Sequence, residues 1–163
     1  MSISVHFCVD VKGSGCVAEE QLFSNWERYR PALLANKRLE GAIIIAAPGT
    51  EQVCFEDELP NPVLHLCFGA VPAILKGDPV TVAYFNQPGE IRIAVDGAVA
   101  HVSGDFLSSL QADRRELAVA LFGCGRRFLD LLRKMPPDAA HYWERTLALF
   151  AEPEKAAEQA LAG

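Results

Sequence analysis

The spacing of Gly13, Gly15 and Ala18 matches the dinucleotide-binding turn G-x-G-x-x-A. The motif follows a predicted strand and precedes a predicted helix, which is the context in which backbone N–H groups hold a pyrophosphate. Against this function, the preceding strand alternates polar and apolar residues, and the next predicted strand ends at Pro48-Gly49 without an acid placed for a ribose. The sequence favours a plain turn and no cofactor, and a small cofactor- or nucleotide-binding protein stays open as an alternative.

Histidine and cysteine residues supply the candidate metal ligands. His6 and Cys8 are two residues apart, as are His65 and Cys67, so each pair would point to one side of a strand. His101 is a further candidate. No third and fourth ligands follow at a spacing typical of structural zinc. We therefore predict partly buried histidines and cysteines, and no metal site.

Candidate catalytic groups also have simpler interpretations. Cys124 lies between Gly123 and Gly125, but on a helix it falls in an apolar row, where a thiol packs as a small apolar group. The glycines then allow close approach of another element. His141 and Glu144 share a helix face, but they form only half of a di-metal carboxylate motif. We predict no catalytic residues and no enzyme.

Acidic residues cluster around one predicted strand, and the cluster has two interpretations. It can be a solvated strand edge whose charges block edge pairing. It can also be a docking surface for a basic partner, with Phe55 or Leu59 as an apolar anchor if either faces outward. The candidate partner-binding residues are Glu51, Phe55, Glu56, Asp57 and Glu58.

Composition limits the function classes. The chain has 163 residues, half of them hydrophobic, and a net charge of -6, so it can bury a core but lacks the basic surface that binds nucleic acid. The sequence shows no secretory signal and no apolar run long enough to span a membrane, which predicts a cytoplasmic protein. An odd number of cysteines without C-x-x-C spacing fits a reducing compartment. These cysteines, expected to be reduced and apolar, are Cys8, Cys16, Cys54, Cys67 and Cys124.

Asp113 to Lys134 is predicted to be the central core helix. Apolar residues fall in two adjacent helical rows, which make a stripe too wide for one helix to shield and so require a sheet beneath it. Asp113 with Glu116 forms a capping-box pattern, and Pro136 with Pro137 prevents continuation. The two rows are Leu117, Leu121, Cys124, Phe128, Leu131 and Ala118, Phe122, Gly125, Leu129, Leu132.

Strands are predicted on both sides of a central helical segment. Alternation predicts a strand over Ile3 to Val11 with its valines and Phe7 buried, then a hairpin from Gly41 to Asp57 with Val53 and Phe55 inward. Asp96-Gly97 is a strong two-residue hairpin signal. It joins two strands of an antiparallel meander, whose three predicted strands are Val80 to Asn86, Glu90 to Asp96 and Ala98 to Ser103.

Three further helices complete the prediction. One covers Leu22 to Leu33, with Pro31 expected to end or kink it near Tyr29. A second begins at Asn61-Pro62 and is cut short by Pro72, although a strand over Val63 to Phe68 stays open. The third covers Asp138 to Phe150, and residues 152–163 are expected to form a frayed helical tail. The chain is therefore predicted to be one α+β domain, residues 1–163, with a mainly antiparallel sheet and helices on one face.

The hairpin from Pro88 to Ser103, followed by the helix from Arg115 to Arg133, resembles the C-terminal half of small acidic bacterial immunity proteins of polymorphic toxin systems. The resemblance covers residues 62–134 and rests on a pattern of core residues. It implies a cytoplasmic module that neutralises a cognate secreted effector, such as a nuclease, by binding it. The acidic charge balance agrees with a basic partner. A non-enzymatic adaptor subunit is the other alternative.

Overall fold

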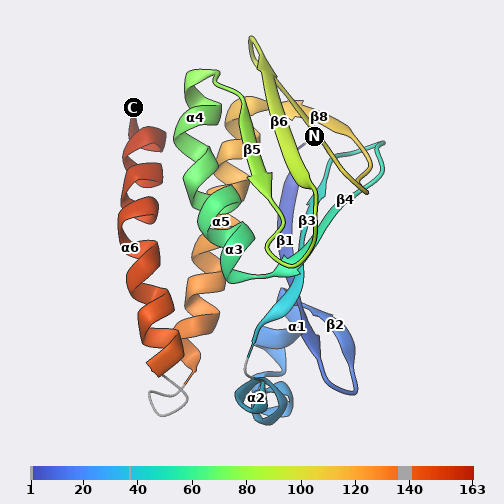
Figure 1. Cartoon of the computed structure of the whole chain (residues 1–163), viewed down its shortest axis with the longest axis vertical. Helices are drawn as coiled ribbons and strands as arrows, with labels where there is room; N and C mark the ends of the chain where they lie inside the picture. Colours follow the sequence, from blue (N-terminus) through green and yellow to red (C-terminus); the bar gives the residue numbers. More distant parts are fainter. Residues whose placement is uncertain (1, 37, 136–140) are drawn as a thin grey trace.

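The computed structural model describes residues 2–36, 38–135 and 141–163. It contains two four-stranded antiparallel sheets and a layer of helices, so the predicted α+β class is confirmed (Figure 1). The strands form two sheets where the sequence suggested one. The helical segment from residue 60 to residue 76 lies between the two sets of strands along the chain.

The first sheet has the order β2-β1-β3-β4, with every pair antiparallel. Its strands are β1 (Ser4–Val11), β2 (Gly15–Ala18), β3 (Glu40–Ala46) and β4 (Val53–Glu58). The predicted first strand and the β3–β4 hairpin are confirmed. β2 was not predicted, because its four residues lie inside the glycine motif, which forms the turn of a β-hairpin.

A disulfide between Cys8 and Cys16 links β1 to β2, with the two Cα atoms 5.6 Å apart. The prediction that both cysteines are reduced, apolar residues is therefore wrong. Asp10 is the residue opposite Cys16, so the bond runs diagonally across the hairpin. That contact depends on strand register, which cysteine spacing alone does not give. Among the described residues, Cys54, Cys67 and Cys124 are free.

The second sheet is a meander with the order β5-β6-β7-β8. Its strands are β5 (Val80–Ala83), β6 (Glu90–Asp96), β7 (Val99–Gly104) and β8 (Leu110–Asp113). Gly97 has a φ of 58°, as the predicted tight turn requires. β8 was missed because four residues are too short for a clear alternating pattern.

The first predicted helix is two helices, α1 (Glu19–Ser24) and α2 (Trp26–Ala35), with the break at Asn25. Pro31 lies inside α2, so the expected end near Tyr29 is wrong. Tyr29 and Leu33 are both buried, one on either side of the proline. Their packing offsets the one backbone hydrogen bond that Pro31 cannot donate, so the helix continues.

A continuous helical segment follows β4: α3 (Pro60–Pro62), the π-helix η1 (Val63–Gly69) and α4 (Ala70–Lys76). The strand alternative for Val63 to Phe68 is therefore wrong. Pro72 does not end the segment, which stops at Gly77, where φ is 88°. The π-helix buries Leu66, Cys67 and Phe68 against the other helices.

The predicted core helix is α5 (Arg114–Lys134), and its N-cap is Asp113, whose carboxylate accepts hydrogen bonds from the N–H groups of Arg115 and Glu116. Nearly all of the two apolar rows is buried. Phe128 meets Phe7 of β1 edge to face, with ring centres 5.5 Å apart. The core thus lies between α5, the inner face of the first sheet and the helical segment.

α6 (His141–Ala162) continues beyond the predicted end at Phe150, so residues 152–162 are helical as expected but are part of one longer helix that packs on the core. The predicted start at Asp138 lies outside the described residues. Ala157 is fully buried, Glu154 lies 3.7 Å from Arg126, and Arg115 donates to the carbonyl of Leu161. Figure 1 shows α6 beside α5 and α4. Small alanine side chains let the helices approach, which is why few bulky apolar residues suffice. In the described part of the chain, no helix is long and apolar enough to cross a membrane.

Candidate functional site

The predicted acidic surface is divided by the pleat of β4. Val53, Phe55 and Asp57 point to the inner side of the first sheet, while Cys54 and Glu56 point outward. Phe55 is fully buried and stacks on the ring of Tyr84, with ring centres 4.3 Å apart. The interpretation of Phe55 as an exposed anchor is therefore wrong, because strand alternation places it in the core.

Asp57 is a buried connector between the two sheets. The residue is 5% exposed, and its carboxylate accepts hydrogen bonds from the backbone N–H groups of Phe85 at 2.8 Å and Asn86 at 3.2 Å. It also accepts from the N–H of Glu58 and from the side-chain amide of Asn61. These bonds hold the β5–β6 turn against the end of β4. Asp57 thus has a structural role, where an exposed docking charge was expected.

Glu58 is only 9% exposed, so it too is not the solvated charge that the sequence suggested. Glu51 and Glu56 are exposed, as expected for partner-binding residues. Glu51 accepts a hydrogen bond of 2.7 Å from the hydroxyl of Ser108, at the loop before β8. Of the acidic run on β4, only Glu56 remains available on the outer face.

Glu56 borders a concave surface of about 780 Å³ on the outer face of the first sheet, which we call the acidic trough. Two other exposed carboxylates, Asp10 of β1 and Glu40 of β3, line it, with Arg38 as its basic residue. Residues Asn86 and Gln87 of the β5–β6 turn line it too, so both sheets contribute. The rest of the lining is mostly small groups, the Cys8–Cys16 disulfide, Ala18, Gly41, Ala42 and Cys54, with Ile44 as a larger apolar side chain.

Glycine at position 41 has a steric reason. A Cβ atom at Gly41 would collide with the backbone oxygen of Cys8, so glycine allows β3 to lie against β1 here. The residue of β4 opposite Ala42 is Glu56. The register therefore places the carboxylate of Glu56 beside the small side chain of Ala42.

The electrostatics of the acidic trough favour cations. Among the described residues, none of the carboxylates of Asp10, Glu40 and Glu56 forms an ion pair. Partial burial, together with the negative charge of Glu56, raises the pKa of the Cys54 thiol. A raised pKa keeps this thiol protonated at neutral pH and makes it a poor nucleophile.

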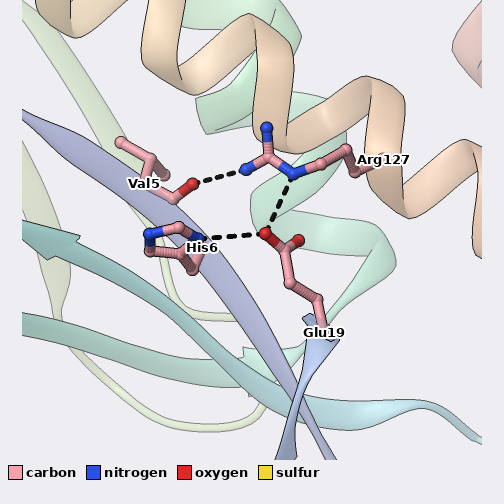
Figure 2. A network of polar contacts seen from close by, with 4 residues as sticks. All are labelled: Val5, His6, Glu19 and Arg127. Carbon is pink, nitrogen blue, oxygen red and sulfur yellow. Dashed lines mark hydrogen bonds and ion pairs between the residues drawn. The ribbon is translucent and has the colours of Figure 1, made fainter. Parts of the chain in front are cut away.

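A second polar cluster lies where α5 meets β1 (Figure 2). Glu19 is buried, and one of its carboxylate oxygens lies 2.9 Å from Nε of Arg127 and 3.0 Å from Nδ1 of His6. Arg127 also donates to the carbonyl oxygen of Val5 at 2.7 Å. β2 pairs with β1 only from Cys8 onward, so Arg127 satisfies a strand group beyond the end of β2.

The thiol of Cys124 interacts electrostatically with Glu19 and Arg127 of this cluster. Its pKa is raised well above the ordinary value by a hydrogen bond with Cys67 and by burial, so the thiol stays protonated at neutral pH. The predicted packing role of Cys124 agrees with this. Sequence reasoning missed the pair of Glu19 and Arg127, because 108 residues separate them and neither belongs to a motif.

The remaining candidates are not brought together. Gly13 and Gly15, with φ of 85° and 71°, turn the chain from β1 into β2, so the glycines lead into a strand and α1 begins only after Ala18, at Glu19. His65 and Cys67 lie on the π-helix, and Cys8 is in the disulfide. Within residues 2–36, 38–135 and 141–163, no group of three His, Cys, Asp or Glu side chains could hold a metal ion.

Comparison of the chain with protein-family models, with curated proteins and with solved structures finds no match.

Proposed function

We propose that this protein is a non-enzymatic, immunity-type inhibitor that binds and neutralises a basic toxin or effector, such as a nuclease, through the acidic trough. The observation that carries the proposal is the concave outer face of the first sheet, with three exposed carboxylates that form no ion pair within the described chain. A lysine or arginine side chain of a partner would balance the negative charge of these carboxylates.

The shape of the acidic trough suits a protein partner. The small groups of the lining let lysine or arginine side chains of the partner approach the sheet, while Asp10, Glu40 and Glu56 supply acceptors around them. With a net charge of -6, the whole chain also attracts a basic partner at long range, which raises the association rate. Of the binding residues predicted from the sequence, the proposed surface includes Glu56. Asp10 and Glu40 take the place of the predicted residues that are buried.

The proposal keeps the cytoplasmic location that the sequence predicts. The Cys8–Cys16 disulfide weighs against a strongly reducing compartment, because such bonds are rare in cytosolic proteins. An alkylation experiment separates a reducing from an oxidising compartment. Cells are treated with an alkylating reagent, the protein is denatured without reductant in the presence of the reagent, and the labelled cysteines are counted. Five labelled cysteines support the cytoplasm, and three support an oxidising compartment.

The test of function uses the product of the neighbouring gene as the binding probe, in a catalytically inactive form. Wild-type protein is expected to form a complex with it and to inhibit its active form. Replacing Asp10, Glu40 and Glu56 by lysine is expected to weaken the complex at least tenfold, with the melting temperature near wild type, because exposed charges contribute little to folding.

A matched control replaces Glu20, Asp78 and Glu152, three exposed acids outside the acidic trough, by lysine. Each triple variant brings the net charge from -6 to about zero, so only position differs. Equal loss of affinity in the two variants contradicts a localised site. A neighbouring gene product that is not basic, or that forms no complex at low salt, contradicts the proposed function itself.

A further inference from the structure

Phe106 combines two unfavourable features at one residue. It is the one non-glycine residue with positive φ in the described chain, at 63°, and its side chain is 85% exposed. A bulky residue in the left-handed region is strained, and glycine or asparagine adopts this conformation more readily. Folding alone gives no reason for phenylalanine here, since the ring buries little surface within the chain.

The backbone on both sides of Phe106 is held in place by hydrogen bonds. The N–H of Asp105 donates to the carbonyl of Glu90 at 3.0 Å, and the N–H of Glu90 donates to the Asp105 carboxylate at 3.1 Å. The hydroxyl of Tyr84 donates to the carbonyl of Asp105, and the N–H of Leu107 to that of Gly104. The ring is thus presented on a fixed support, and a binding partner need not order the loop.

The loop that carries Phe106 adjoins the end of the acidic trough. Ser108, two residues further on, donates its hydroxyl to Glu51, and Figure 1 shows the β3–β4 turn beside the loop between β7 and β8. Cys54, which lines the trough, is three residues after Glu51, a span of about 10 Å of extended chain. One partner of ordinary size can therefore cover both the trough and the Phe106 loop.

We propose that Phe106 is the apolar anchor of the partner interface and inserts into an apolar pocket of the basic protein that occupies the acidic trough. This inference rests on the proposed function. The exposed carboxylate of Glu51 belongs to the same region through its bond to Ser108, so the partner surface beside the receiving pocket is expected to be basic. Phe106 stands at the end of the acidic trough, and aromatic residues are enriched in protein–protein interfaces.

The anchor and the acidic trough act on different rate constants. Long-range charge sets the association rate, whereas a desolvated aromatic contact forms after encounter and sets the dissociation rate. Loss of Phe106 is therefore expected to speed dissociation and to leave the association rate and its salt dependence near wild type.

The test compares Phe106→Gly and Phe106→Asn with Leu149→Ala, a control at a 65% exposed leucine on α6. The probe is again the inactive product of the neighbouring gene. Both Phe106 variants are expected to dissociate at least tenfold faster, with a melting temperature equal to or above wild type because the strain is relieved. The control is expected to change neither quantity.

Unchanged dissociation in the Phe106 variants overturns the anchor while the proposed function stands. A drop in melting temperature in both variants also overturns it, because Phe106 would then support the fold. If the reversal in the acidic trough has no effect on association but the Phe106 variants dissociate faster, the trough is the part that fails. Absence of any wild-type complex overturns both proposals.

Discussion

The two faces of the first sheet are built from the same strands, but their side chains do different work. The inner face carries Phe7, Ile43 and Phe55, which are fully buried in the core. The outer face carries Asp10, Glu40 and Glu56 above small residues and buries little. Buried core side chains and the exposed side chains of the proposed recognition surface therefore alternate along β4, and neighbouring substitutions are expected to have different consequences.

The largest expected effect is on the inner side. Replacing Phe128 by Ala is expected to lower the free energy of unfolding by about 3–5 kcal/mol, the usual range for a truncated core aromatic. Its ring meets those of Phe7 and Phe150, so the cavity would open between α5, β1 and α6. Denaturant melts measure this value. A loss below about 1 kcal/mol would mean that α5 does not carry the core.

Two adjacent acids on β4 provide the sharpest contrast. Asp57→Ala is expected to destabilise the fold by about 1–3 kcal/mol, because it leaves buried N–H groups of the β5–β6 turn without an acceptor. Glu56→Ala is expected to change the unfolding free energy by less than about 0.5 kcal/mol, as surface substitutions usually do. Equal effects in chemical denaturation would mean that the pleat does not separate the two roles.

Stability is expected to fall at alkaline pH, in part through Cys124. The pKa of this thiol is raised in the folded protein from its ordinary value of 9.0, so the unfolded chain loses the proton first. Its contribution is present below pH 9 and is lost as the pH rises toward the folded pKa, with a slope of at most about 1.4 kcal/mol per pH unit.

Cys124→Ala is expected to make the unfolding free energy decline less steeply between about pH 9 and about pH 10.5. This range begins near the ordinary thiol pKa. Cys54→Ala is expected to flatten it less, because that thiol lies on the solvated outer face, although its pKa is raised too. A larger effect for Cys54 in pH-dependent melts would reverse the assignment of core and outer face.

The sequence predicts the elements that have local signals. α5 was found because apolar rows, an N-cap at Asp113 and the prolines after it all agree, and the Asp96-Gly97 turn because few residues accept positive φ. The predicted inward direction of Val53 and Phe55 is confirmed. The same alternation places Asp57 inward, so its burial could have been read from the sequence.

The acidic trough could not be predicted in the same way. Asp10, Glu40 and Glu56 lie on three strands, and only the register of β1 with β3 and of β3 with β4 brings them to one face. The ion pair of Glu19 with Arg127 likewise depends on how α5 lies across β1. Such long-range pairings leave no local pattern in one sequence.

The most direct test of the central claim is the association rate with the inactive neighbouring gene product, measured at low and at high salt. Reversal of Asp10, Glu40 and Glu56 to Lys is expected to slow association at low salt at least tenfold and to remove most of its salt dependence, since salt screens the same long-range attraction. The control reversal of Glu20, Asp78 and Glu152 is expected to have a clearly smaller effect. Equal rates for the two variants would contradict the claim that the outer face of the first sheet is the recognition surface.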